Sequence, residues 1–227
     1  MKVLITRPEP GASATAETLR QRGFMPVLAP CLVIRPLAPE LPLNPAALVL
    51  TSGQAIAALP AGWRDIPAFC VGDATAARLR AAGFARVESA GGNAGDLLRL
   101  VAARRLPGTH LLAVGQRQGE RLASGLRAAG IETQRLEVYA AEPAHALPAA
   151  MLDALARGEI GTALFYSAES AAAFARFEPQ GLARVTALAL SPAVAAALQG
   201  LPWRAIRVAL APNEGDLLAL LNEAANR

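Results

Sequence analysis

The chain has 227 residues, of which 53% are hydrophobic and 18% charged, and its formal net charge is +4 at pH 7. This composition is that of a well-packed globular protein and excludes a disordered chain. The single lysine, Lys2, and the scattered arginines form no basic stripe with aromatic residues, which argues against a nucleic-acid partner. The length favours two small α/β domains, each able to bury a core.

The sequence gives no sign of export or of a membrane span. A short apolar run at the N-terminus meets Arg7-Pro8 and is too short for the apolar part of a signal peptide, so we expect a cytoplasmic protein. The longest uncharged stretch, 185–203, has the length of a membrane helix but contains Pro192 and Pro202. We therefore predict no membrane span and no membrane partner.

The cysteines, histidines and motifs narrow the chemistry. Cys31 and Cys70 each lie in an apolar, strand-like run, which predicts two reduced core thiols rather than a disulfide or redox pair. His110 and His145 lack the spacing of metal ligands. The absence of GxGxxG, P-loop, GxSxG, HExxH and CxxC motifs argues against nucleotide binding and against hydrolase, zinc and thioredoxin-like chemistry.

An internal repeat organises the sequence. Each copy alternates an apolar strand, a turn of small or hydroxyl residues and an alanine- or leucine-rich helix. The matched segments are 49–56 with 165–171, 69–76 with 189–195, and 86–98 with 207–218. The first copy continues as strand, helix, glycine and strand to Tyr139; the second copy lacks that portion, but the same pattern occupies residues 3–34.

The repeat predicts one continuous and one discontinuous lobe. The predicted boundaries are 45–140 for the continuous lobe, 1–36 plus 143–227 for the discontinuous lobe, and 37–44 and 140–148 for two proline-containing, extended connectors. Short strands that alternate with helices predict an α/β fold of two small doubly wound, flavodoxin-like parallel sheets. We expect about five strands in each lobe and a cleft between the lobes, where ligands would meet helix N-termini.

Small residues and hydroxyl groups follow most of the predicted strands. Each such turn can be a plain helix cap, whereas together they can form a donor surface for an anion, and the residues alone leave both readings open. The turns are Thr6-Arg7, Thr51-Ser52-Gly53, Gly72–Thr75, Gly115-Gln116, Ser167–Ser170 and Ser191–Ala193. Asp73 and Glu169 would repel a carboxylate, so we expect them to face away from a ligand.

Two tyrosines and one arginine end predicted strands. Tyr139, beside the second connector, can face the cleft or can place its ring in the core with its hydroxyl in water. We interpret Tyr166 mainly as a packing residue. Arg7 can bind a ligand carboxylate or pair with a neighbouring acidic side chain.

Short motifs across essentially the whole chain resemble, in sequence and order, those of uroporphyrinogen-III synthases. They are Leu4–Pro8, Leu50–Ser52, Val71–Ala76, Val138-Tyr139, Ser167–Ser170, Ser191-Pro192 and Gly215–Leu218. The resemblance implies a cofactor-free hydro-lyase of tetrapyrrole biosynthesis that closes hydroxymethylbilane, a linear molecule with eight carboxylates. Loss of water would give an azafulvenium, and attack by ring D would give a spiro intermediate whose reclosure inverts that ring.

The resemblance also implies roles for individual residues. Tyr139 would assist the departure of water. The implied substrate contacts are Arg7, Thr51, Ser52, Gly53, Gly72, Thr75, Ser167, Ala168, Ser170 and Ser191. The chain departs from the family pattern at Ala193-Val194, where many relatives have a hydroxyl residue after the proline, and at Val114-Gly115, where Arg-Gly is usual.

The resemblance leaves assembly and alternatives to be tested. We expect a monomer that can make transient contact with hydroxymethylbilane synthase, the enzyme that supplies the substrate. The main alternative is a two-lobed small-molecule binding or effector-sensing protein without catalysis, because such proteins also pass the chain twice between similar lobes. A nucleotide-sugar transferase is a weaker alternative.

Overall fold

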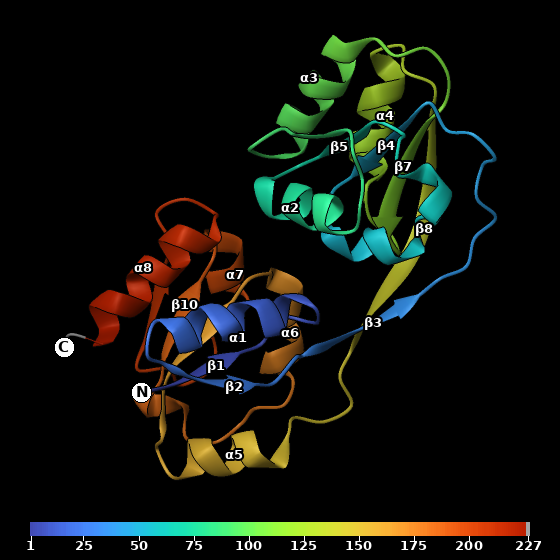
Figure 1. The fold of residues 1–227 in the computed structure, drawn as a ribbon. Coiled ribbons are helices and arrows are strands. Elements are labelled where there is room, and N and C mark those ends of the chain that lie inside the picture. Colours follow the sequence, from blue (N-terminus) through green and yellow to red (C-terminus); the bar gives the residue numbers. More distant parts are fainter. Residues whose placement is uncertain (226–227) are drawn as a thin grey trace. The chain divides into compact units, whose positions relative to one another are not determined.

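The computed structural model describes residues 1–225 and divides into two compact units. One unit comprises Met1–Val33 and Glu142–Arg227, and the other comprises Ile34–Ala141. Each unit is a mainly parallel β-sheet with helices on both faces, so the predicted α/β fold class is confirmed (Figure 1). No helix among the described residues is both long enough and apolar enough to cross a membrane.

The first unit contains a five-stranded sheet in the order β11-β10-β9-β1-β2. Its strands are β1 (Lys2–Ile5), β2 (Met25–Leu28), β9 (Ile160–Phe165), β10 (Thr186–Ala189) and β11 (Ala205–Val208). Its helices are α1 (Gly11–Gln21), α5 (Ala149–Ala156), α6 (Ala168–Ala175), η3 (Leu182–Arg184), α7 (Pro192–Ala196) and α8 (Glu214–Ala225). This is the flavodoxin-like order, in which the second strand of the unit lies outside the first.

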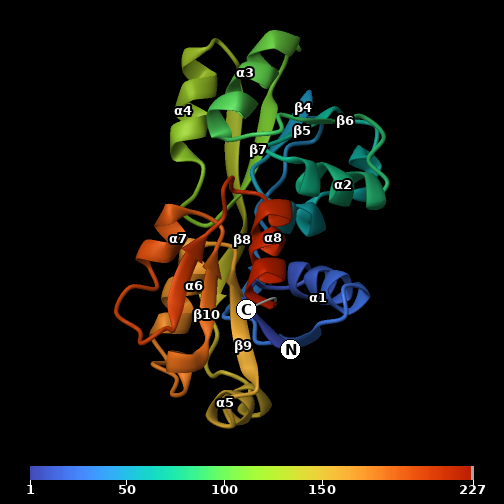
Figure 2. The ribbon, with the colours of Figure 1, turned by 90° about the vertical axis from the view of Figure 1, so that its left-hand side faces the viewer.

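The two faces of this sheet are covered by different helices. Val3 and Ile5 of β1 point to the face where α1 and α8 pack, and both side chains are fully buried. On the opposite face, the ring of Phe165 makes edge-on contacts with Phe174 of α6 and with Trp203. Figure 2 shows α1 and α8 on one side of β9 and β10 and α6 and α7 on the other. Burial on both faces explains why the central strands β1 and β10 read as continuous apolar runs.

The second unit contains a six-stranded sheet in the order β3-β8-β7-β4-β5-β6. Its strands are β3 (Leu32–Pro36), β4 (Ala47–Leu50), β5 (Ala68–Cys70), β6 (Val87–Ser89), β7 (His110–Gly115) and β8 (Thr133–Pro143). The start of β3, 32–33, and the end of β8, 142–143, fall within the bounds of the first unit. Its helices are η1 (Gly53–Ala58), η2 (Ala61–Trp63), α2 (Asp73–Ala81), α3 (Ala94–Arg104) and α4 (Glu120–Ala128). Without β3, this sheet has the same strand order as the first sheet. The strands that match β1 and β2 are β7 and β8, which come last in the sequence of this unit.

Three expectations about elements were wrong. The second sheet has six strands instead of about five, because β3 lies beside β8 and the backbone N–H of Leu37 donates to Val138 O at 2.9 Å. The strand expected before residue 34 is split into β2 and β3, with Pro30 in the gap. The helix expected after Ser52 is the 3₁₀ helix η1, not an α-helix.

Cys31 and Cys70 are free and buried, so the prediction of two core thiols is confirmed. Burial raises the pKa of the Cys31 thiol to about 12. Burial likewise raises the pKa of Cys70 to about 11, although the nearby Arg80 partly opposes the shift. Both side chains therefore remain thiols at neutral pH and pack as small apolar residues.

An ion-pair network at the start of the first sheet predicts a small pH effect. Arg157 Nε donates to Glu159 Oε1 at 2.6 Å, and Lys2 Nζ donates to Glu159 Oε2. The hydrogen bond from Arg157, followed by that from Lys2, lowers the pKa of Glu159 from 4.5 to about 2. A lowered carboxyl pKa stabilises the fold above the unfolded value, and the stabilisation is lost as the pH falls through the folded value.

We expect Glu159→Gln to lower the free energy of unfolding slightly at pH 7. It should also reduce the loss of stability between pH 4.5 and about 2, because the carboxyl group that titrates there is gone. Urea unfolding at several pH values measures both effects. A pH dependence identical to that of the wild type would show that this network does not contribute to acid sensitivity.

Candidate functional site

In the first unit, the predicted serines lie where β9 and β10 end and their helices begin. Ser167 Oγ accepts a hydrogen bond from Ser170 N at 3.0 Å and caps α6, which starts at Ala168. Ser191 Oγ accepts from Val194 N at 3.4 Å and caps α7. The capping role of both serines is therefore present, and each remains only partly buried.

The expected substrate contact from the Ser170 side chain needs correction. Ser170 is fully buried, and its hydroxyl accepts a hydrogen bond from Ser167 Oγ at 3.0 Å. It cannot touch a ligand in this structure and stabilises the start of α6.

The structure also shows what the residues do at the two positions that depart from the family pattern. The Val114 side chain is fully buried in the core, and the N–H of Val194 is used by the Ser191 cap.

In the second unit, the predicted contacts lie at the carboxyl ends of β4 and β5. Ser52 Oγ accepts from Gln54 N at 3.2 Å and caps η1, and Thr51 precedes it, partly buried. Gly72 is the residue before α2, and Thr75 lies in the first turn of that helix. Asp73 is exposed at the start of α2. Each of these turns presents small residues at the edge of the sheet where α/β folds bind ligands.

Gly53 is buried because an arginine side chain packs over it. A Cβ atom at Gly53 would lie 2.5 Å from Arg78 Nη1 and 2.7 Å from Arg78 Cζ. Arg78 lies in α2 three residues after Thr75, so both project from the same side of the helix. Arg78 was not among the predicted site residues, although this helical spacing could have indicated it.

Tyr139 lies within β8, which continues to Pro143, and pairs with Gly115, the last residue of β7. It is only 5% exposed. Its hydroxyl donates to Gln118 Oε1 at 3.4 Å, and its ring packs against Gly115 of β7. A Cβ atom at Gly115 would lie 2.8 Å from Tyr139 Cζ, so glycine makes room for the ring. The ring thus belongs to the core, and the hydroxyl is directed to the polar residues that follow β7.

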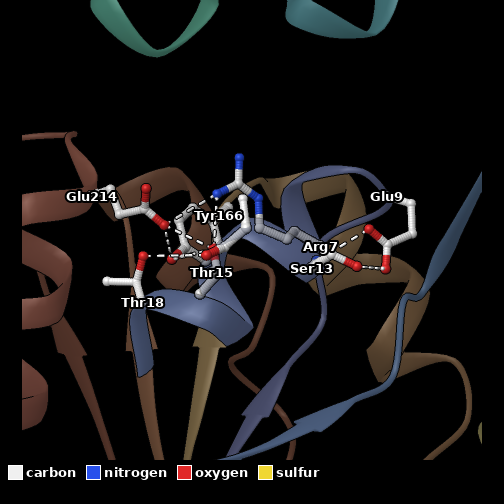
Figure 3. Close-up of polar contacts among 8 residues, drawn as sticks. Arg7, Glu9, Ser13, Thr15, Thr18, Tyr166 and Glu214 are labelled. Atoms are coloured by element: carbon white, nitrogen blue, oxygen red, sulfur yellow. Dashed lines mark hydrogen bonds and ion pairs between the residues drawn. The ribbon is translucent and has the colours of Figure 1, made fainter. Parts of the chain in front are cut away.

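Arg7 belongs to a cluster of four polar residues at the carboxyl end of β1, which we call the Arg7 cluster: Arg7, Thr15, Tyr166 and Glu214 (Figure 3). Tyr166 OH donates to Glu214 Oε1 at 2.7 Å, and Thr15 Oγ1 donates to the same oxygen at 2.8 Å. Arg7 Nη1 lies 3.3 Å from it, and the guanidinium carbon lies 4.0 Å from the centre of the Tyr166 ring. Of the two readings of Arg7, the structure thus shows pairing with an acid.

The ring of Tyr166 packs against the core, as expected. Its hydroxyl has a second role that was not predicted, because it is the closest partner of the Glu214 carboxylate. Burial, followed by the nearby Glu214 charge, raises the pKa of Tyr166, so its phenol stays protonated as a donor. Glu214 was also missed. A comparison of the two copies could have found it, since Asn-Ala-Gly-Asp at 93–96 becomes Asn-Glu-Gly-Asp at 213–216.

The comparison with known protein families decides the identity of the chain. A family model described as uroporphyrinogen-III synthase HemD matches residues 13–219. The chain belongs to this family. The resemblance seen in the short motifs is thereby confirmed, and membership of a uroporphyrinogen-III synthase family of tetrapyrrole biosynthesis favours enzymatic activity over the binding-protein alternative.

Solved members of the uroporphyrinogen-III synthase family share the fold. The uroporphyrinogen-III synthetase from Helicobacter pylori is 19% identical, with 98% of each chain covered and a TM-score of 0.67. A mutant uroporphyrinogen III synthase from Thermus thermophilus is 20% identical, with 100% of this chain and 99% of that chain covered and a TM-score of 0.51. No curated protein is similar enough to this sequence to count as a match.

Most of the predicted site residues lie at the carboxyl edges of the two sheets. Arg7, Ser167, Ala168 and Ser191 lie at the carboxyl edge of the first sheet. Thr51, Ser52, Gly53, Gly72, Thr75 and Tyr139 lie at the carboxyl edge of the second sheet. Among the described residues, no three His, Cys, Asp or Glu side chains are grouped so that they could hold a metal ion.

Proposed function

We propose that the chain is a cyclising hydro-lyase that converts hydroxymethylbilane to uroporphyrinogen III, with loss of water and inversion of ring D through a spiro intermediate. The family match over residues 13–219 is the observation that carries the proposal. The reaction class also suits the capped turns at both sheet edges, because helix N-termini and backbone N–H groups bind carboxylates.

The main physical task is to hold ring D so that the correct carbon meets the cation. Hydrogen bonds to charged groups contribute about 1.5–3 kcal/mol each, so a few contacts to the eight carboxylates can fix the ring. Only about 3–4 kcal/mol is needed to favour one closure by a few hundredfold. Proper orientation can contribute up to roughly 7–11 kcal/mol. We assign this role to the turns at Ser52 and Gly72 in the second unit.

In this proposal Tyr139 assists the departure of the hydroxyl group as water. The pyrrole nitrogen supplies the electron pair that expels the hydroxyl, so a weak acid or a single hydrogen bond is sufficient. The Tyr139 hydroxyl already donates to an amide oxygen, that of Gln118, at 3.4 Å. This long contact can be exchanged for a shorter one to the leaving oxygen.

The proposal includes a cytoplasmic monomer that uses no cofactor. The reaction neither oxidises nor reduces the substrate, and a proton and a hydroxyl group are the only groups lost as water. Because hydroxymethylbilane also closes spontaneously to the type I isomer, direct transfer from hydroxymethylbilane synthase through a transient contact would limit this loss.

The test is the isomer ratio formed from freshly made hydroxymethylbilane. The products are oxidised to porphyrins and separated by chromatography, with heat-denatured protein as the control. We expect type III with the native protein and type I with the control. A binding protein without catalysis would retain the polycarboxylate and leave the isomer mixture as it forms in buffer, and that result would reject the proposed function.

A further inference from the structure

The Arg7 cluster brings three donors to one carboxylate oxygen. Glu214 Oε1 accepts from Tyr166 OH at 2.7 Å and from Thr15 Oγ1 at 2.8 Å, and Arg7 Nη1 donates to it at 3.3 Å (Figure 3). A carboxylate oxygen has two lone pairs, so three donors exceed what this single atom needs. The arrangement is therefore a receptor for a carboxylate, and in this structure the carboxylate is supplied by the chain itself.

The three donors are held in place by contacts that do not involve Glu214. Thr15 is 1% exposed on α1. The Tyr166 ring packs against the apolar core under α1 and α8, and it lies under the Arg7 guanidinium at 4.0 Å. On its other side the guanidinium lies against Gly11, where a Cβ atom would be 2.5 Å from Arg7 Nε. The receptor is thus formed before any carboxylate enters it.

Glu214 is the movable member of the cluster. Its side chain is 42% exposed and starts from the first residue of α8, so a change of rotamer would place the carboxylate in water. Its pair with Arg7 is part-exposed and solvent-screened, which makes it weak and easily exchanged. Thr15 and Tyr166 would then offer their hydroxyl groups to another carboxylate.

The start of α8 does not require this side chain. The corresponding helix of the other copy, α3, begins with Ala94 in place of Glu214, and both helices are capped by an asparagine. Asn93 Oδ1 accepts from Asp96 N at 3.3 Å, and Asn213 Oδ1 accepts from Asp216 N at 2.9 Å. Because the cap works with alanine at this position, the asparagine cap of α8 does not depend on the Glu214 carboxylate.

We propose that Glu214 is an internal stand-in for a substrate carboxylate, and that Arg7, Thr15 and Tyr166 form the subsite that it vacates when the ligand binds. This rests on the proposed function, which supplies a substrate with eight carboxylates. Glu214 would then prevent smaller anions from occupying the subsite and would give way only to a ligand that is also held elsewhere. It is a specificity-determining residue and takes no part in bond making.

The proposal predicts that removing the stand-in tightens binding. A subsite that is occupied by Glu214 for about 70–90% of the time lowers the apparent affinity about three- to tenfold. Glu214→Ala should therefore bind uroporphyrin III, the stable oxidised form of the product, about three- to tenfold more tightly than the wild type. Fluorescence titration of uroporphyrin III measures the dissociation constant, and a thermal melt checks that each variant is folded.

Two variants separate the stand-in from a general effect of charge. Glu214→Asp keeps the charge but is one methylene shorter, so its carboxylate cannot reach the three donors, and it should also bind more tightly. Glu17→Gln removes a carboxylate from an exposed position on α1 and should leave the dissociation constant within about twofold, because salt screens distant surface charges. Tighter binding by Glu17→Gln to the same extent as by Glu214→Ala would overturn the proposal.

Gly11→Ala tests the receptor itself. The added Cβ would displace the Arg7 guanidinium without changing any charge, so binding of uroporphyrin III should weaken in both the wild-type and Glu214→Ala backgrounds. If the wild-type protein forms type III product but Glu214→Ala binds uroporphyrin III no more tightly than the wild type, the stand-in role of Glu214 is overturned and the proposed function is not. A wild-type protein that neither binds uroporphyrin III nor changes the isomer ratio would overturn the proposed function with it.

Discussion

Replacing Tyr139 with phenylalanine should slow product formation by between about fivefold and a hundredfold while type III remains the product. The change removes only the hydroxyl group that we propose to act on the leaving oxygen. The ring, which packs against Gly115 and is 5% exposed, stays in place. Initial rates and the isomer ratio, both from chromatography of the oxidised products, test this directly.

The outcomes of the Tyr139→Phe experiment distinguish three roles for the residue. A lower rate with type III product supports assistance to the departing water. A larger share of type I would show instead that Tyr139 positions ring D. Full retention of the wild-type rate would reject any part for the hydroxyl in the reaction. Gln118→Ala serves as a matched control, because it removes one hydrogen-bond partner of the Tyr139 hydroxyl but keeps the phenol.

Gly181→Ala should be one of the most destabilising small substitutions in the first unit, at about 2–4 kcal/mol. Gly181 has a φ of +89°, a region that residues with a side chain rarely adopt. An added Cβ atom would also lie 2.7 Å from the backbone oxygen of Leu155 in α5. Since the obstacle is backbone in a packed helix, it cannot move aside at low cost.

Gly23→Ala is the matched control for this prediction. Gly23 has a φ of +80°, but an added Cβ atom would meet nothing within 4 Å. We expect it to lose only about 1 kcal/mol, the cost of the left-handed backbone alone. Urea unfolding followed by circular dichroism gives both values. Equal losses in the two variants would show that the contact with Leu155 has no energetic effect.

Much of the fold follows from local patterns in the sequence. Parallel strands buried on both faces, such as β4 and β7, read as apolar runs, and the asparagines at 93 and 213 mark the starts of α3 and α8. Because both copies of the repeat show these signals in the same order, the sequence predicts two doubly wound sheets. It does not predict β3 as a sixth strand, since strand pairing depends on a partner about a hundred residues away.

The polar contacts of the candidate site were less predictable. Tyr166 and Glu214 are 48 residues apart, and Arg7 and Glu214 are 207 residues apart. No helical or strand periodicity links such positions, and only the fold brings them to one sheet edge. The sequence could indicate which residues follow strands, but it could not show which hydroxyl groups are buried, as for Ser170, or already paired.

The shared strand order has a consequence for the ancestry of the chain. Both sheets have the same spatial order of strands, but in the second unit the sequence begins at β4 and ends with β7 and β8. The second unit is a circular permutant of the first, in which β8 matches β2 and β4 matches β9. Its termini lie between β8 and β4. In the first unit the matching connection, between β2 and β9, is where the second unit is inserted. Duplication of one module and insertion of the copy into the original gives this arrangement. Such an insertion is tolerated when the strands that enter and leave the inserted module are neighbours, as β3 and β8 are.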